Sequence, residues 1–238
     1  MDARLKKRVM RPRLSIIIPT LNEAAEIETR LAALAPLRQQ GVQIIIADGG
    51  SSDATVTLAA PFADLMIDAP RGRAAQMNAG ALHASAPALL FLHADTVLPK
   101  HADNLIHQAL QHSAWGRFDI TLSGTHPMLR VIAMMMNWRS RLTGIATGDQ
   151  AIFVRRNVFD QLHGFAPIAL MEDIELCYRL KKISRPACLS QRVVSSGRRW
   201  QKYGVWRTIW LMWRLRLAYF FGADPRELAV RYGYLPKT

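Results

Sequence analysis

Residues 14–23 read LSIIIPTLNE, an apolar run that ends at a proline and is followed at once by polar residues. The run is rich in isoleucine and does not alternate with polar residues, which is typical of a strand covered on both faces. Residues 42–47 and 88–92 have the same character. These three runs predict strands inside a largely parallel sheet.

Segments with helical spacing of apolar residues separate the runs. They predict helices over residues 22–37, from Asp53 and over 72–84, with a weaker strand over 64–68. The first hundred residues therefore predict the order β-α-β-α-β-α-β. A helix around 101–112, strands over 117–122 and 151–154 and a helix opening at Glu172 follow. We predict an α/β fold, a mostly parallel sheet flanked by helices, with ligand sites at the carboxyl ends of its strands.

The chain has 238 residues, half of them hydrophobic, and a formal net charge of +13. A polyanion-binding protein would explain that charge, but its distribution favours another reading. Residues 1–13 hold six basic side chains and one acidic, and residues 179–238 hold fourteen and two. The middle, residues 14–178, holds eleven basic and fifteen acidic side chains. The chemistry of that middle is therefore not that of a general nucleic-acid-binding surface, and no nucleic-acid partner is expected.

This charge pattern and the predicted elements suggest three parts: a basic segment over 1–13, an α/β domain over 14–195 and a basic helical extension over 196–238. The two cysteines, Cys177 and Cys188, have neither a disulfide framework nor zinc-type spacing. The apolar run after the basic N-terminus is too short for a signal peptide, and arginines interrupt the most apolar region, 205–221. We expect a cytoplasmic protein.

Polar clusters follow three of the predicted strands, and the carboxyl ends of parallel strands meet at one edge of a sheet. The clusters contain Pro19, Thr20, Asn22 and Glu23; Asp48, Gly50 and Asp53; and His93, Ala94 and Asp95. Asp48 is suited to accept a hydrogen bond from a base or a ribose, although a turn aspartate that caps the next helix is the alternative. The first cluster is equally compatible with an ordinary helix start.

No glycine-rich dinucleotide fingerprint and no P-loop occur. The phosphates of a nucleotide ligand must therefore be bound in another way. Asp95 offers a hard oxygen to Mg²⁺ or Mn²⁺, which are typically held by one or two carboxylates and substrate phosphates. His93 is a candidate second ligand, with a structural histidine as the alternative. Arg73, at a predicted helix start, is a candidate for the diphosphate, with a solvated arginine as the alternative.

The pair Glu172-Asp173 stands at the beginning of a predicted helix. One of these carboxylates is a candidate general base. Simple capping of the helix by two acids explains the pair equally well, because the helix dipole stabilises negative charge at this end.

Together these residues resemble family 2 glycosyltransferases of the GT-A fold. The likeness rests on five motifs over residues 14–182: IIIPTLNE at 16–23, DGGSSD at 48–53, the segment from Gly72 to Asn78-Ala79-Gly80, His93-Ala94-Asp95, and Glu172-Asp173. Within the family the chain is most similar to a small bacterial subgroup, the radical-SAM/selenodomain-associated transferase 2 proteins. The combination of motifs is specific, although each motif alone is weak.

The resemblance implies a nucleoside-diphosphate sugar, most simply a UDP-sugar, as donor. It assigns donor binding to Pro19, Thr20, Asn22, Glu23, Asp48, Gly50, Asp53, Arg73, Asn78 and Ala94. His93-Ala94-Asp95 takes the place of the family's DxD motif, so Asp95 would hold Mn²⁺ or Mg²⁺, and His93 replaces the first aspartate. Asp173 matches the catalytic base of an inverting transfer to a hydroxyl acceptor, with Glu172 orienting it. Gly148, Asp149, Gln150, Arg199 and Trp200 would lie on the acceptor side.

The extension contains Trp206, Trp210 and Trp213 at helical spacing, with arginines around them. This composition is typical of a helix at an anionic membrane surface, which would suit a lipid-linked acceptor and a place on the inner face of the cytoplasmic membrane. Packing on the catalytic domain or across a dimer is the alternative, because Arg216 falls roughly opposite Arg207 and Arg214. The run Met134–Met136 is expected to line the core or an acceptor groove.

Two other classes of function compete with this one. A nucleotidyltransferase would share the metal carboxylate and the nucleotide pocket, but it would normally need a basic triphosphate-binding loop after the first strand. Residues 19–23 contain no Lys or Arg there. A nucleic-acid-binding protein would explain the basic ends but not the acidic strand ends, and no known nucleic-acid-binding motif is present.

Overall fold

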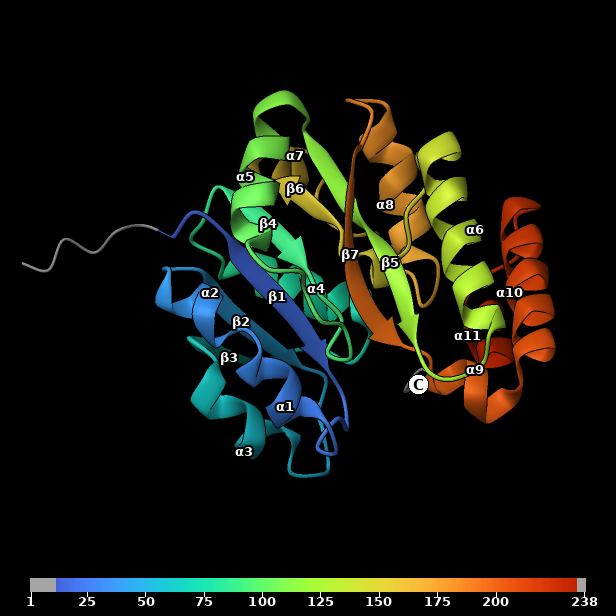
Figure 1. Cartoon of the computed structure of the whole chain (residues 1–238), viewed down its shortest axis with the longest axis horizontal. Helices are drawn as coiled ribbons and strands as arrows, with labels where there is room; N and C mark the ends of the chain where they lie inside the picture. The colour runs from blue at the N-terminus through green and yellow to red at the C-terminus, as the bar shows by residue number, and fades with distance from the viewer. Residues whose placement is uncertain (1–11, 235–238) are drawn as a thin grey trace, which may run out of the picture.

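The computed structural model describes residues 12–234. Most of the basic segment expected over 1–13 lies outside this range. Figure 1 shows a central sheet with helices on both faces and three further helices at the C-terminal side. The predicted α/β architecture is confirmed.

The sheet has seven strands in the order β3-β2-β1-β4-β6-β5-β7. Strands β1 to β4 are mutually parallel where they pair, β6 is antiparallel to both β4 and β5, and β7 is parallel to β5. The strands are β1 (Ser15–Thr20), β2 (Gln43–Asp48), β3 (Leu65–Asp68), β4 (Ala88–Phe91), β5 (Trp115–Ser123), β6 (Phe153–Arg155) and β7 (Ala187–Ser196).

Alternate residues of the central strands point to opposite faces, and both faces are covered. Ile16 and Ile18 of β1 belong to a first core cluster, which includes residues of the helices over 27–32, 102–112 and 128–143. Ile17 belongs to a second cluster, which includes residues of the helices over 73–82, 156–161 and 172–181. All three isoleucines are at most 1% exposed. Burial on both faces explains why these strands read as continuous apolar runs.

The helices of the catalytic region lie between the strands in sequence. They are α1 (Ile27–Ala32), α2 (Ala35–Gln39), α3 (Thr55–Ala59), α4 (Arg73–Leu82), α5 (Ala102–His112), α6 (Met128–Thr143), α7 (Arg156–Gln161) and α8 (Glu172–Lys181), with 3-10 turns η1 (Ala60–Phe62) and η2 (Gly148–Gln150). The single helix expected over 22–37 is wrong. It is divided into α1 and α2, because a new helix begins at Ala35 with Pro36 in its first turn, where a missing N–H costs nothing.

The C-terminal helices are α9 (Arg198–Tyr203), α10 (Val205–Phe220) and α11 (Pro225–Tyr232). They join the catalytic region through a third core cluster, in which Leu215 and Leu228 pack with Leu170, Met171 and Ile174. The boundary expected between residues 195 and 196 falls at the end of β7, and it stays a prediction. Within residues 12–234 no helix is both long and apolar enough to cross a membrane.

Candidate functional site

The predicted polar clusters meet at the carboxyl edge of the sheet. Thr20 and Asp48 end neighbouring strands in register. The Thr20 hydroxyl donates a hydrogen bond to Asp48 Oδ1 at 3.0 Å, and both side chains are buried. Pro19 precedes Thr20 in β1 and is paired with Ala47. A buried side-chain hydrogen bond therefore joins the carboxyl ends of β1 and β2.

Asp48 shapes the loop that follows it. Its Oδ2 accepts hydrogen bonds from the backbone N–H groups of Gly50 and Ser51, and its Oδ1 accepts one from the Ser51 hydroxyl. Gly50 has φ +82°, a left-handed conformation that suits glycine. With Thr20, four donors of the chain occupy this carboxylate. Its contact to a base stays a prediction, and its observed contacts fix the turn.

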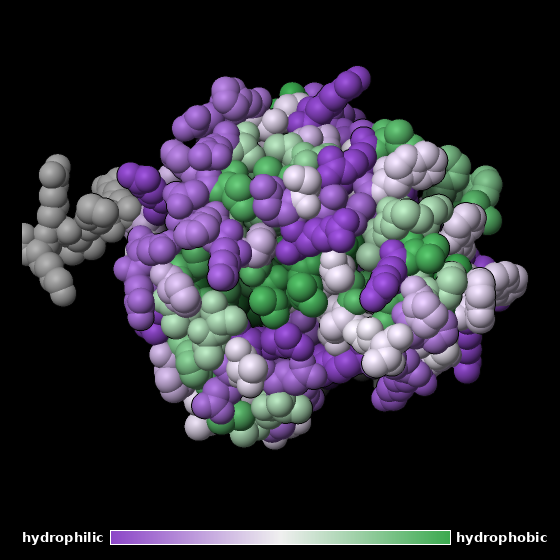
Figure 2. Space-filling model, viewed as in Figure 1, coloured by the Kyte–Doolittle hydropathy of each residue, from purple (hydrophilic) through white to green (hydrophobic). Residues whose placement is uncertain are grey.

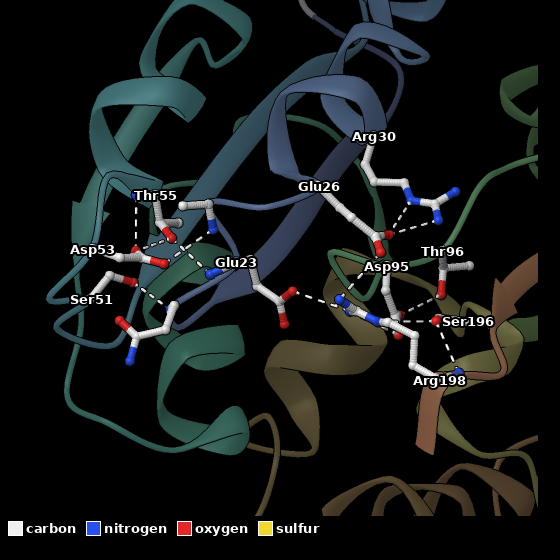
Figure 3. Close-up of polar contacts among 12 residues, drawn as sticks. Glu23, Glu26, Arg30, Ser51, Asp53, Thr55, Asp95, Thr96, Ser196 and Arg198 are labelled. Carbon is white, nitrogen blue, oxygen red and sulfur yellow. Dashed lines mark hydrogen bonds and ion pairs between the residues drawn. The ribbon is translucent and has the colours of Figure 1, made fainter. Parts of the chain in front are cut away.

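Asn22 and Asp53 fasten the loops after β1 and β2 to each other (Figure 3). Asn22 Oδ1 accepts from the Ser52 N–H at 2.8 Å, and Asp53 accepts from the N–H groups of Ala24 and Thr55. The hydrogen bond from the Thr55 hydroxyl is the main cause that lowers the pKa of Asp53. These residues hold the rim of the site in one conformation.

Arg198 reaches into the same rim from the end of β7. Figure 3 shows its guanidinium among three carboxylates: Glu23 at 3.3 Å, Glu26 at 3.4 Å and Asp95 at 3.9 Å. Burial raises the pKa of Glu23, and the charge of Arg198 partly offsets this effect. Sequence reasoning singled out Arg199 and Trp200 of this segment and missed Arg198. The only available signal was the adjacent pair of arginines after an extended run.

Arg199 and Trp200 both make contacts within the fold. The Arg199 guanidinium donates to the Tyr232 carbonyl at 2.6 Å and stacks on the Tyr232 ring, 3.6 Å from its centroid. Trp200 is half-buried against the first core cluster. Both side chains connect α9 to other parts of the fold, and their place on the acceptor side stays a prediction.

The segment His93-Ala94-Asp95 follows β4 and faces the turn η2. His93 Nδ1 lies 3.0 Å from Asp149 Oδ1. A Cβ atom added to Gly148 would lie 2.4 Å from His93 Nε2, so the ring packs directly on this glycine. Asp149 holds Nδ1, and Nε2 lies against the Gly148 backbone, so His93 positions η2. Its role as a metal ligand stays a prediction. Within residues 12–234 no three His, Cys, Asp or Glu side chains are grouped to hold a metal ion.

Asp95 keeps a carboxylate at the rim beside Ala94. One carboxylate with the remaining ligands supplied by phosphates fits the usual binding of Mg²⁺. A metal would have to replace the weak contact between Asp95 and Arg198. Of the two predicted metal ligands, Asp95 fits a phosphate-bound ion, and ligation by His93 stays a prediction.

Asp173 stands at the start of α8 and is held by two backbone donors. The Gly148 N–H donates to its Oδ2 at 2.8 Å, and the Ile174 N–H donates to its Oδ1 at 2.7 Å. Burial raises the pKa of Asp173, against the effect of these two hydrogen bonds. A half-buried carboxylate with a raised pKa, fixed by backbone donors, is suited to act as a general base.

Glu172 is 5% exposed, and burial together with the charge of Asp173 raises its pKa to about 7. Arg73, which opens α4 after Gly72, faces the same carboxylates. Desolvation disfavours its charge, but Tyr232, Glu172, Asp149 and Asp173 outweigh this and raise its pKa. Arg73 is therefore the cation of this acidic group, and its side chain is exposed.

Two predicted site residues turn away from the cleft. Gln150 is fully buried, and its amide donates to Ser140 of α6 at 3.1 Å. The expectation that Gln150 meets the acceptor is wrong, because the side chain closes η2 against α6. Asn78 exchanges two hydrogen bonds with the backbone of Phe165, at 2.9 and 2.8 Å, and so ties α4 to the loop before α8. Its contact to a donor stays a prediction.

The family model "Glycosyl transferase family 2" matches residues 15–166, which contain most of this site. The chain belongs to glycosyltransferase family 2. The PGL/p-HBAD biosynthesis glycosyltransferases of Mycobacterium bovis and Mycobacterium tuberculosis are 39% identical to this chain over 105 residues. The match covers 41% of this chain and 41% of each relative, so the chain spans well under half of their length.

Solved glycosyltransferases share the fold. Staphylococcus aureus TarS residues 1–349 with UDP-GlcNAc has a TM-score of 0.62 and 17% identity, over 77% of this chain and 58% of that one. The mannosyltransferase PcManGT of Pyrobaculum calidifontis with GDP-Man and Mn²⁺ has a TM-score of 0.63 and 20% identity, over 87% and 61%. The sheet and its flanking helices are thus those of a family 2 glycosyltransferase.

We expect Gly148→Ala, which adds a single methyl group, to lower turnover strongly. The new methyl group must displace His93 or the Gly148 N–H that donates to Asp173. Turnover should fall at least about tenfold with a small change in donor affinity, as expected when a positioned catalytic group is misplaced. Steady-state kinetics check this. In a His93→Ala background the same substitution should cost much less, and an equal cost in both backgrounds would contradict the packing argument.

Glu172→Gln should change how stability depends on pH. Between its ordinary pKa of 4.5 and its raised pKa of about 7, the folded chain holds a proton on Glu172 that the unfolded chain has lost. Wild-type stability therefore decreases through this window as pH rises, by roughly 3 kcal/mol. Relative to wild type, the glutamine variant should gain stability from pH 5 to pH 8 in urea unfolding. The exposed Glu227→Gln is the control, and parallel curves for Glu172→Gln and wild type would contradict the burial effect.

Proposed function

We propose that the chain transfers a glycosyl group from a nucleoside-diphosphate sugar to a hydroxyl acceptor, with inversion at the anomeric carbon and with a divalent metal ion. The observation that carries this proposal is the convergence of Asp173, Arg73 and Asp95 on one polar edge of the sheet. Asp173 is a carboxylate with a raised pKa, and Arg73 is a cation that faces the same cleft.

In the proposed reaction, Asp173 accepts the proton of the acceptor hydroxyl. The acceptor oxygen forms a bond to the anomeric carbon, and the bond from that carbon to the diphosphate oxygen breaks, so the electron pair leaves with the nucleoside diphosphate. The N–H groups of Gly148 and Ile174 hold the carboxylate in one orientation throughout. Direct attack from the side opposite the leaving group gives inversion.

The second requirement of the reaction is that the negative charge of the departing diphosphate is stabilised. Arg73 is suited to bind its oxygens, because an arginine can form two parallel hydrogen bonds to phosphate. Asp95 would hold Mn²⁺ or Mg²⁺ together with those oxygens, and the metal, when bound, supplies stabilisation of the leaving group. The solved relatives with Mn²⁺, PcManGT and the glucosyl-3-phosphoglycerate synthase of Mycobacterium tuberculosis, support a divalent ion.

The donor is proposed to be UDP-linked, from the sequence resemblance and from the UDP-GlcNAc complex of TarS. GDP-Man, the donor in the PcManGT complex, represents the other class of donor that a binding experiment has to compare with UDP-sugars. Membership of the radical-SAM/selenodomain-associated transferase 2 subgroup rests on the sequence resemblance alone.

A thermal-shift screen tests the proposal. The full chain is heated with UDP-, GDP-, ADP- and dTDP-sugars, each with and without Mn²⁺. A donor that binds the folded chain at a hundred times its Kd adds about 2.7 kcal/mol of stability, enough to shift the melting temperature by several degrees. We expect a shift with one class of donor that requires Mn²⁺. The absence of any shift with every donor would contradict the proposal.

A further inference from the structure

Helix α10 carries a continuous stripe of large apolar side chains along its exposed side. Trp206, Trp210, Trp213, Leu217 and Phe220 follow one another at spacings of four and three residues, so they share one face of the helix. Each is between 59% and 74% exposed. The opposite side of the helix, with Thr208 and Leu215, is buried. Single exposed apolar residues are ordinary, but a stripe of five along a whole helix is not.

A second stripe lies on α6. Val131, Met134, Met135, Trp138 and Leu142 are all exposed and occupy one face of that helix. The expectation that the methionine run lines the core or a groove is therefore wrong for Met134 and Met135. The two helices lie on the same side of the molecule in Figure 1, and both contribute residues to the first core cluster. Figure 2 shows hydrophobic and near-neutral side chains gathered over this side of the molecule. The two stripes together are called the α6–α10 face below.

Arginines border the stripe on α10. At 3.6 residues per turn, Arg207 and Arg214 lie about 80 to 100° to one side of the stripe and Arg216 about 80° to the other. From the sequence, the position of Arg216 suggests a break in the amphipathic pattern. In the structure the exposed stripe runs between Arg207 and Arg214 on one side and Arg216 on the other. Aromatic residues flanked by arginines are the arrangement of helices that lie in a lipid headgroup region.

Charge distinguishes a membrane from a second copy of the chain as the occupant. Neither α6 nor α10 contains an acidic residue, whereas both carry arginines at surface positions: Arg130, Arg207, Arg214 and Arg216. Arg141 of α6 is already paired with Asp119. Two copies joined through this face would bring arginines together with no carboxylate of these helices to pair with them. An anionic bilayer supplies the missing negative charge and accepts the aromatic side chains.

A groove beside the stripe also fits lipid. It has a volume of about 580 Å³ and is lined by apolar residues of α10, among them Leu211, Leu215, Leu217 and Phe221, together with Arg214 of α10 and Arg231 of α11. A groove lined by apolar side chains and two guanidinium groups is complementary to a phospholipid, in which a hydrocarbon chain is joined to a phosphate.

From these observations we propose that the α6–α10 face binds the surface of an anionic lipid bilayer. The protein then lies on the membrane without crossing it, at a surface that presents acidic phospholipids. Helix α6 also carries Arg139, whose charge interacts with Asp173 and whose Nε and Nη2 atoms are buried without a hydrogen-bond partner within the described chain. If the proposed function holds, docking brings a lipid-borne hydroxyl to the acceptor side of the catalytic carboxylate.

Vesicle flotation of the full-length chain tests the proposal independently of any transfer activity. Wild type is expected to float with vesicles of equal phosphatidylcholine and phosphatidylglycerol, and much less with phosphatidylcholine alone. The triple variant Trp206→Ser, Trp210→Ser, Trp213→Ser should lose at least tenfold in partitioning. Because these side chains are exposed, the variant should keep the wild-type circular dichroism spectrum. Leu82→Ser, which removes an 80% exposed leucine from α4, should bind vesicles as wild type does.

Charge reversal separates the two contributions. Arg207→Glu with Arg214→Glu should lower binding to the anionic vesicles at least tenfold and leave the weak binding to neutral vesicles unchanged. Equal flotation of wild type and the triple tryptophan variant would overturn the proposal. A dimer of the 26.8 kDa chain in light scattering that the triple variant abolishes, with no flotation of wild type, would assign the face to a second copy instead.

Discussion

Replacing Asp173 by Asn is expected to lower the rate constant for sugar transfer about 1,000-fold while donor affinity stays within about twofold, because general-base catalysis contributes 100- to 10,000-fold and acts after binding. The amide keeps the shape of the carboxylate, and its oxygen can accept from one of the two backbone donors, Gly148 or Ile174, while its NH2 group faces the other. It cannot take a proton from the acceptor. Single-turnover transfer and titration of the donor measure the two quantities separately.

The pH dependence of the same step gives a second reading. Burial raises the pKa of Asp173, and only its ionised form can act as the base. Wild-type turnover should therefore fall as pH is lowered through that raised pKa, at a higher pH than for an ordinary aspartate. Asp160→Asn, an exposed aspartate on α7, is the matched control and should leave the rate unchanged. Full activity of Asp173→Asn would remove this residue from its role.

Asp95→Ala should have the second largest effect. A bound divalent ion contributes several kcal/mol to the stabilisation of a leaving phosphate, so the loss of its protein ligand should lower Mn²⁺-stimulated turnover at least about 100-fold. Donor affinity should also cease to respond to Mn²⁺. Titration of donor at several Mn²⁺ concentrations measures both effects.

Arg198→Ala is the informative comparison for Asp95. The Arg198 guanidinium lies 3.9 Å from Asp95 and is balanced by Glu23 and Glu26. Its removal should keep the response to Mn²⁺, because the carboxylate that holds the metal remains. If Asp95→Ala retains the full response to Mn²⁺, the assignment of the metal to this residue is contradicted.

The central strands could be predicted because each is buried on both faces, so that burial alone makes a continuous apolar run. Strand β7 was not predicted. Its sequence, ACLSQRVVSS, alternates little and has exposed residues at Ser190, Gln191 and Arg192, since it lies at the edge of the sheet and carries a register irregularity against β5. Nothing in that local pattern distinguishes such an edge strand from a loop.

The same edge strand explains what sequence reasoning missed in the site. Strand β7 delivers Arg198 to Glu23, a residue 175 positions earlier in the chain. Local spacing has no access to such a contact. Gln150 failed for a different reason: its position beside Asp149 suggested the same orientation, but the tight turn η2 sends consecutive side chains to opposite sides, one to His93 and one into the core. Residues at strand ends were predictable because strand polarity alone places them on one edge.

The stereochemistry of the product decides whether the transfer inverts the anomeric carbon. In proton NMR spectra recorded during turnover of an α-linked sugar nucleotide with Mn²⁺, the β-configured sugar product is expected to appear first, whether the acceptor is water or an added alcohol. The signal should be absent with Asp173→Asn. Initial release of the α-configured product by the wild-type chain would contradict an inverting transfer that uses Asp173 as the base.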